Sequence, residues 1–212
     1  MNPFARLPQP PAPEDVAPEE VADLEHVVER TGRVHGAESP AAQYFGALLN
    51  SPPLAAALTR LGTEVRRGGL RGTYTDADRE LMDIALAVAL GSNAILPIHI
   101  PDALAVGVRP DAVEALLMRR DDRLTDDERQ LVTYAREFVA GTVNDVTYAA
   151  LRDRFGGRGA VEFTVLVGFL LMTIRLWQAF GLPEPSDDEM RTLLRKLREG
   201  TAPLPDAQAR IG

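Results

Sequence analysis

The chain has 212 residues, of which 45% are hydrophobic and 25% are charged, and its formal net charge is -8. The absence of cysteine excludes disulfides, thiol nucleophiles, dithiol redox centres, iron–sulfur clusters and cysteine-based zinc sites. The acidic balance, without a concentrated basic stripe, argues against a nucleic-acid partner, because phosphate binding needs clustered positive charge.

The first 16 residues contain five prolines, which predicts an extended arm. Met1 leads into this stretch rather than into a basic head and an apolar core, so we expect no signal peptide and a cytoplasmic protein. The longest apolar run extends from Phe163 to Ile174 and is bounded by Glu162 and Arg175. A membrane-spanning helix needs about 20 residues, which is more than this run supplies, so we expect no membrane partner.

From residue 18 onward the sequence pattern is helical. Ser51 followed by Pro52 predicts the start of a helix that runs to about residue 67 and ends at Gly68 and Gly69. Thr75 caps the next predicted helix, in which apolar residues recur at helical spacing. Further helices are predicted over about 93–106 and 110–118, from Asn144 or Asp145 to about Gly156, and over 159–180. Two more helices are predicted to begin at capping boxes, one formed by Thr125 with Glu128 and the second by Ser186 with Glu189.

These elements predict an all-α bundle of about seven helices, with the apolar helix 159–180 at its centre. We expect part of that helix to face another subunit. The predicted domains are an arm over residues 1–16, a helical domain over 17–185, and a charged helix and tail over 186–212.

Of the three histidines, His99 has the most unusual surroundings, because it lies between two prolines in an apolar segment. Ser92, Ile95 and Leu96 fall on the same side of the predicted helix, and they are candidates for contact with a bound small molecule. His26 is predicted on a solvated helix face and His35 in a flexible stretch.

A buried imidazole needs a polar partner, and Glu80 is the candidate. It lies in an otherwise apolar stripe that precedes the Gly91 turn, and His99 follows that turn at a comparable separation along the chain. At about 1.5 Å per residue, an antiparallel helix pair brings the two side chains within reach. Both a buried structural pair and a proton relay fit this spacing.

The segment RELMDIALAVALGSNAILPIHIPDALAVGVRPDAVEAL resembles the core motif of the alkylhydroperoxidase AhpD and carboxymuconolactone decarboxylase superfamily. The stretch from LTDDERQLVTYAREF to QAFGLPEP is similar to the longer single-domain members, and the resemblance covers roughly residues 40–185. In the hydroperoxidase branch a relay glutamate precedes the histidine by the same interval that separates Glu80 from His99. The two cysteines of that branch fall on Ser92 and Ile95, so thiol peroxidase chemistry is excluded.

The decarboxylase branch has a Tyr-Glu-Trp type segment where this chain has residues 94–96, Ala-Ile-Leu. Loss of the second carboxyl argues against lactone decarboxylation, and the more apolar pocket suits a neutral hydrophobic substrate, such as an intermediate of secondary metabolism. The resemblance therefore implies a cofactor-independent enzyme, lyase-like or isomerase-like, in which His99 and Glu80 transfer protons during decarboxylation, isomerisation or cyclisation.

Further substrate contacts are expected from Arg175, which would clamp a carboxylate or enolate oxygen, although an ion pair with Glu80 or a subunit contact is an alternative. Gln178 is a candidate donor to a substrate carbonyl, and Tyr44 a candidate lining residue. Trp177 is expected in the core.

No metal is expected, because His99 has only Asp102 nearby in sequence and a third ligand is not evident. The resemblance implies a homo-oligomer, as a dimer, trimer or hexamer, acting on a small molecule. The alternative function is a non-catalytic small-molecule-binding or scaffold protein that kept the fold.

Overall fold

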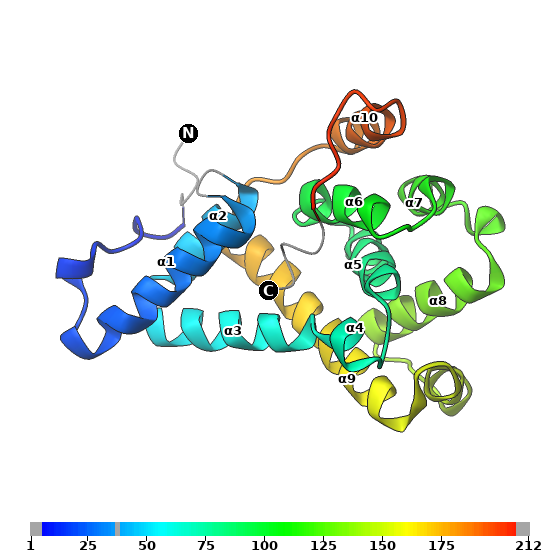
Figure 1. Cartoon of the computed structure of the whole chain (residues 1–212), viewed down its shortest axis with the longest axis horizontal. Helices are drawn as coiled ribbons and strands as arrows, with labels where there is room; N and C mark the ends of the chain where they lie inside the picture. The colour runs from blue at the N-terminus through cyan, green and yellow to red at the C-terminus, as the bar shows by residue number, and fades with distance from the viewer. Residues whose placement is uncertain (1–5, 37–38, 207–212) are drawn as a thin grey trace. The chain divides into compact units, whose positions relative to one another are not determined.

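The structure is a computed structural model that describes residues 6–36 and 39–206. The described residues form α-helices and short 3-10 turns, and no strand, which confirms the predicted all-α class (Figure 1). The helices are α1 (Val21–His35), α2 (Pro40–Leu48), α3 (Pro52–Val65), α4 (Gly68–Arg71), α5 (Asp76–Leu90), α6 (Leu96–Ala105), α7 (Pro110–Leu117), α8 (Asp126–Ala140), α9 (Asp145–Phe180) and α10 (Asp187–Arg198). They outnumber the expected seven, partly because Gly68 and Gly69 begin the short α4 instead of only ending the helix before it.

The chain divides into two compact units. Within the described part of the chain, the first comprises residues 6–36, 39–64 and 175–183, and the second comprises residues 65–174 and 184–206. The domain boundaries expected after residues 16 and 185 stay a prediction.

In the first unit, α1 packs against α2. The ring of Tyr44, on α2, stacks on the indole of Trp177 with 5.8 Å between the ring centroids. Trp177 also donates a hydrogen bond from Nε1 to the carbonyl of Pro183. Its side chain is buried, as expected for a core residue.

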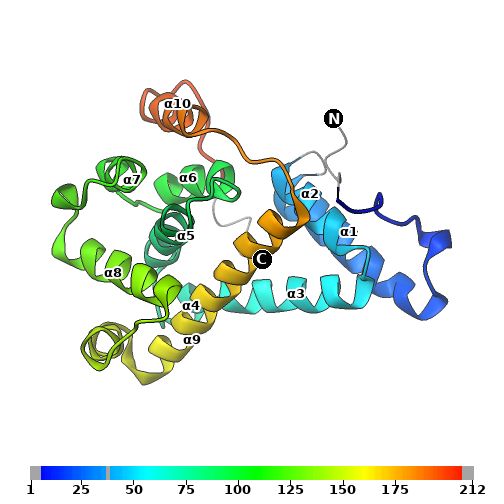
Figure 2. The ribbon, with the colours of Figure 1, turned by 180° about the vertical axis from the view of Figure 1, so that it is seen from behind.

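In the second unit, α5 packs against α6, α7 and α8, and α10 packs against α6 and α7 (Figures 1 and 2). Thr75 caps α5 through a capping box with Asp78, and Gly91 ends the helix in a left-handed conformation. The capping boxes predicted at Thr125 and Ser186 are confirmed as well. Local sequence signals therefore set both ends of the helix that carries Glu80.

The helix α6 begins at Leu96, later than the start near residue 93 that the sequence predicts. Pro97 occupies its first turn, where the missing N–H of a proline costs nothing. Upstream of the helix, Ser92 Oγ and the Asn93 amide both donate to Glu184 Oε2, at 2.9 and 2.8 Å. These bonds hold residues 92 and 93 outside the helix.

The long helix α9 joins the two helices that the sequence predicts around residue 157, with a kink at Gly156 where φ is 71°. One face is buried through Phe163, Leu166 and Leu170, whereas Val161 and Val165 are exposed. By length and composition alone, α9 is suited to crossing a membrane, a test that core helices of soluble proteins also pass. Its packing against another subunit stays a prediction.

A substitution at Gly68 tests the packing of the second unit. A Cβ atom built at Gly68 would fall within the ring of Tyr74, whose hydroxyl donates to the Val65 carbonyl. We expect Gly68→Ala to lower the free energy of unfolding by about 2 kcal/mol, because the buried ring must move. Urea denaturation measures this.

The matched control is Gly32→Ala in α1, where no atom lies within 4 Å of the new Cβ. We expect this substitution to leave stability unchanged or to raise it by up to about 1 kcal/mol, since alanine favours helix. Equal effects of the two substitutions would contradict the packing described for Tyr74.

Candidate functional site

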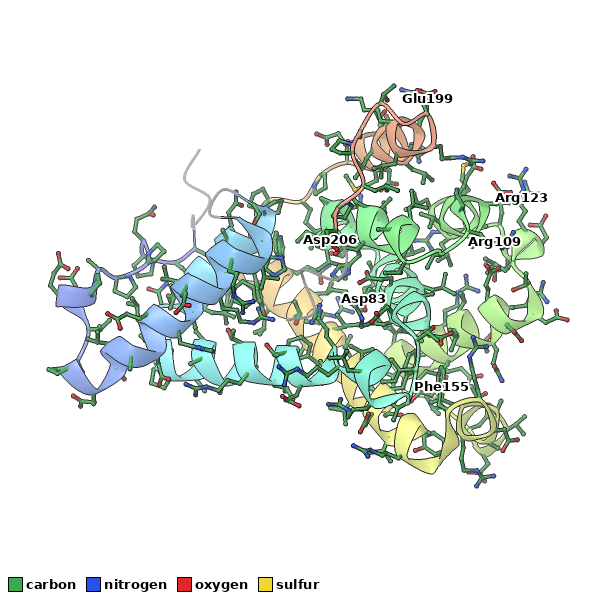
Figure 3. All side chains as sticks on the ribbon, in the orientation of Figure 1. Asp83, Arg109, Arg123, Phe155, Glu199 and Asp206 are labelled. Atoms are coloured by element: carbon green, nitrogen blue, oxygen red, sulfur yellow. The ribbon has the colours of Figure 1, made fainter. Side chains whose placement is uncertain are left out.

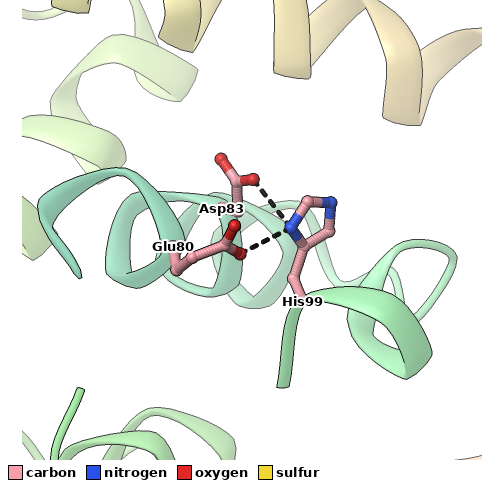
Figure 4. Close-up of side chains that lie close together, drawn as sticks. All are labelled: Glu80, Asp83 and His99. Carbon is pink, nitrogen blue, oxygen red and sulfur yellow. Dashed lines mark hydrogen bonds and ion pairs between the residues drawn. The ribbon is translucent and has the colours of Figure 1, made fainter. Parts of the chain in front are cut away.

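The site is built on α5 and α6, which pack against each other after the turn at Gly91. His99 Nδ1 lies 2.8 Å from Glu80 Oε2 and forms a hydrogen bond with it (Figure 4). Both side chains are buried, with residue exposures of 5% and 1%. The two residues that the sequence pairs by spacing therefore meet in the structure.

A third side chain, Asp83, completes the cluster. Its Oδ2 also lies 2.8 Å from His99 Nδ1, as an ion pair without hydrogen-bond geometry (Figure 4). Asp83 is fully buried on α5, whereas Arg123 and Glu199 are exposed residues of the same unit (Figure 3). Asp83 was not predicted from the sequence, although its position three residues after Glu80 places both acids on one helix face.

Arg79 supplies the second positive charge beside the carboxylates. Its Nη1 lies 2.5 Å from Glu80 Oε1, and its Nη2 lies 3.3 Å from Asp76 Oδ1. Burial acts to lower the pKa of Arg79, but Glu80, Asp83 and Asp76 outweigh it and the pKa is raised. With His99 protonated, two cations and two carboxylates balance one another inside the protein.

The two carboxylates control the protonation of His99. Burial lowers the pKa of the imidazole, but the negative charges of Asp83 and Glu80 and their contacts with Nδ1 more than offset it, and the pKa rises from 6.5 to about 9. Burial likewise raises the pKa of Asp83, yet the charges of His99, Arg66 and Arg79 dominate and lower it. His99 is therefore an imidazolium at neutral pH.

The second ring nitrogen of His99 points away from both carboxylates (Figure 4). Nε2 forms no hydrogen bond within the described part of the chain, and it is not among the side-chain atoms sealed from solvent. With Nδ1 held by the carboxylates, Nε2 is the atom that can exchange a proton with a bound molecule.

Glu80, Asp83 and His99 also form a group of the residue types that bind metal ions. A tetrahedral zinc site with bonds of about 2.1 Å places its ligand atoms about 3.4 Å apart. Here Nδ1 lies 2.8 Å from each carboxylate oxygen, which is shorter than this separation and is in the range of hydrogen bonds and close ion pairs. Because Arg79 and protonated His99 already balance the two carboxylates, the arrangement fits a proton better than a divalent ion.

The other candidates in the second unit lie just before His99. Ser92 is buried, with its hydroxyl donating to Glu184, a partner that the sequence analysis missed. Ile95 is the N-cap of α6 and Leu96 its first residue, and both are buried. Contact of these three residues with a substrate stays a prediction.

Tyr44, Arg175 and Gln178 belong to the first unit. Arg175 Nη1 donates to Gln178 Oε1 at 2.9 Å, and Tyr44 lies in the aromatic stack with Trp177. Their part in substrate binding stays a prediction. An ion pair between Arg175 and Glu80 was the alternative expected from the sequence. In the structure Glu80 forms an ion pair with the adjacent Arg79.

The structure corrects the predicted surroundings of the other two histidines, His35 and His26. His35 is the last residue of α1 and stacks on Phe45 with 5.9 Å between centroids, so it lies in a helix and not in a flexible stretch. His26 is half-buried instead of solvated, and its Nε2 is enclosed without a hydrogen-bond partner.

Residues 52–137 match the model of the Carboxymuconolactone decarboxylase family. The chain contains a carboxymuconolactone decarboxylase family domain. This domain extends from α3 into α8 and includes Glu80, Asp83 and His99, which confirms the family resemblance over residues 52–137. The extension of the resemblance to residues 40–185 stays a prediction. No curated protein and no solved structure matches the chain.

The raised pKa of His99 predicts how the stability of the family domain depends on pH. The folded state holds the proton more tightly than the unfolded state, so this stabilisation is complete below about pH 6.5 and is lost as pH rises through about 9. We expect a loss on the order of 3 kcal/mol in the free energy of unfolding between pH 6 and pH 10. Urea denaturation at a series of pH values measures it.

His99→Gln removes the titrating group and should flatten this part of the pH dependence, whereas the control His26→Gln should keep it. Identical pH dependence in the wild type and His99→Gln would show that His99 does not titrate in this range.

Proposed function

We propose that this protein is a cofactor-independent enzyme of the carboxymuconolactone decarboxylase-like family that transfers a proton to or from a small organic substrate through Nε2 of His99. The observation that supports this function best is the buried imidazole itself. Glu80 and Asp83 hold its Nδ1, and Nε2 is left without a partner in the described part of the chain. A carboxylate-held imidazole is a common arrangement for general acid and base work.

At neutral pH His99 begins the reaction as an acid. The imidazolium donates its Nε2 proton to a substrate oxygen or carbon on which negative charge develops. The neutral imidazole keeps its proton on Nδ1, which continues to donate a hydrogen bond to Glu80. In a decarboxylation, the electron pair of the breaking C–C bond stays on the substrate as carbon dioxide leaves. In an isomerisation or cyclisation, the same nitrogen takes a proton at one position and returns it at another.

The substrate we propose is small and hydrophobic, such as an intermediate of secondary metabolism. Supporting this, Ala94, Ile95 and Leu96 are all apolar and lie within two turns before His99. Thiol peroxidase chemistry is impossible, because the chain has no cysteine. As a further substrate contact we propose Ser92, which lies at the turn before the helix of His99.

We also propose that the enzyme acts in the cytoplasm as a homo-oligomer. The exposed Val161 and Val165, one helical turn apart on α9, support a subunit contact there.

A decarboxylation assay with benzoylacetate, a hydrophobic β-keto acid, tests the function. We expect the wild type to release acetophenone about 100-fold faster than buffer alone, a typical contribution of general acid catalysis. His99→Gln should return the rate to that of buffer. The wild-type rate should be constant below about pH 9 and fall tenfold per pH unit above it, as the imidazolium is lost.

Folding of His99→Gln is checked by circular dichroism, and His26→Gln serves as the matched control with an unchanged rate. Full activity in a folded His99→Gln variant would refute the role of His99. Binding of benzoylacetate and of the ketone phenylacetone without conversion of either would favour a binding or scaffold protein.

A further inference from the structure

Two carboxylates compete for one Nδ1 hydrogen of His99. Glu80 Oε2 and Asp83 Oδ2 both lie 2.8 Å from this nitrogen, but only the contact with Glu80 has the geometry of a hydrogen bond. A single N–H donates well in one direction. Asp83 therefore keeps two buried carboxylate oxygens without a hydrogen bond.

The two carboxylates differ in their other partners. Glu80 has a hydrogen bond from Arg79 as well as the one from His99. Asp83 has neither, and none of its surface is exposed. A buried carboxylate without hydrogen bonds is costly unless a positive charge lies beside it. The cationic group in ion-pair contact with Asp83 is His99.

We infer that Asp83 is a positioning residue that, together with Glu80, keeps His99 protonated, so that the site presents Nε2–H as a donor to substrates whose carbonyl oxygen becomes an enolate or other oxyanion. The inference deepens the proposed function and rests on it for the use of this proton in turnover. It narrows the substrate to a largely apolar molecule with an oxygen function that gains negative charge in the reaction. A cationic donor stabilises that charge as it develops.

Other charged groups around the cluster do not replace Asp83. Arg79 and Arg66 are cations that lower the pKa of Asp83. Asp102 is buried one turn after His99 on α6. On α10, which packs against α6, Asp187 accepts a hydrogen bond from Asn93. The groups that raise the pKa of His99 are Asp83 and Glu80.

An NMR titration of the histidine rings tests the role of Asp83 directly. In the wild type we expect His99 to titrate near pH 9, and in Asp83→Asn at least about one pH unit lower. The control Asp188→Asn removes an acid whose side chain is 88% exposed and should leave the midpoint of His99 unchanged. An unchanged midpoint in Asp83→Asn would overturn the inference.

A second measurement on the wild type covers the case in which Asp83→Asn fails to fold. The carboxyl carbon signal of Asp83 should shift with the same midpoint as the His99 ring, because the two groups are in contact. A carboxyl signal that does not follow the titration of His99 would overturn the role of Asp83.

The substrate class is tested with two probes that share a phenyl ring and differ in the charge of their polar group. Phenylacetate carries a carboxylate that imitates an enolate, and phenethyl alcohol has the same apolar body with a neutral hydroxyl. At pH 7 we expect phenylacetate to shift the His99 Nε2 signal and to bind at least about tenfold more tightly than the alcohol. Equal binding of the two probes, or binding of neither, would overturn the substrate class.

These readouts need no turnover, so their failure is distinguishable from failure of the proposed function. A coupled Asp83 in a protein that converts no substrate would refute the enzyme and keep the positioning role. If catalysis depends on His99 but Asp83→Asn leaves the titration of His99 unchanged, the enzyme function would be kept and the positioning role of Asp83 refuted.

Discussion

A balanced group of four buried charges is the constraint around which the second unit is organised. Arg79, Glu80 and Asp83 on α5 meet His99 on α6, and each is less than one tenth exposed. Removing charges from water costs several kcal/mol per ion, and only close pairing repays this cost. The protein supplies that pairing through two carboxylates at 2.8 Å from one imidazole nitrogen and a guanidinium at 2.5 Å from the further oxygen of Glu80.

The ends of the surrounding helices position these four charged side chains. The capping box at Thr75 and the left-handed Gly91 set the ends of α5, and therefore the face on which Glu80 and Asp83 lie. Glu184 accepts hydrogen bonds from Ser92 and Asn93 and thereby ties the segment that precedes α10 to the turn before α6. The position of the His99 imidazole thus depends on α5, which precedes it in the chain, and on the segment at Glu184, which follows it much later in the sequence.

The balance of charges also decides the chemistry that His99 begins with. Burial lowers the pKa of the imidazole, but the two carboxylates together outweigh burial and raise the pKa to about 9. The nitrogen that faces away from the carboxylates then carries a proton at neutral pH. In the reaction that we propose, an acid of this kind stabilises negative charge that develops on the substrate. The apolar residues before His99 support the hydrophobic substrate of the same proposal.

Much of this protein follows from its sequence. Helical periodicity, two capping boxes, the Thr75 cap and the Gly91 stop predicted the all-α class and most helix ends, because these signals act between residues that are neighbours along the chain. The spacing of Glu80 and His99 on either side of Gly91 pointed to this pair for a related reason, since a turn between two helices brings such positions together. Only the tertiary structure decided which further groups share the site. Asp83, Arg79 and Glu184 act through contacts whose geometry depends on helix rotation and packing, and a periodic pattern does not specify either to within the length of a hydrogen bond.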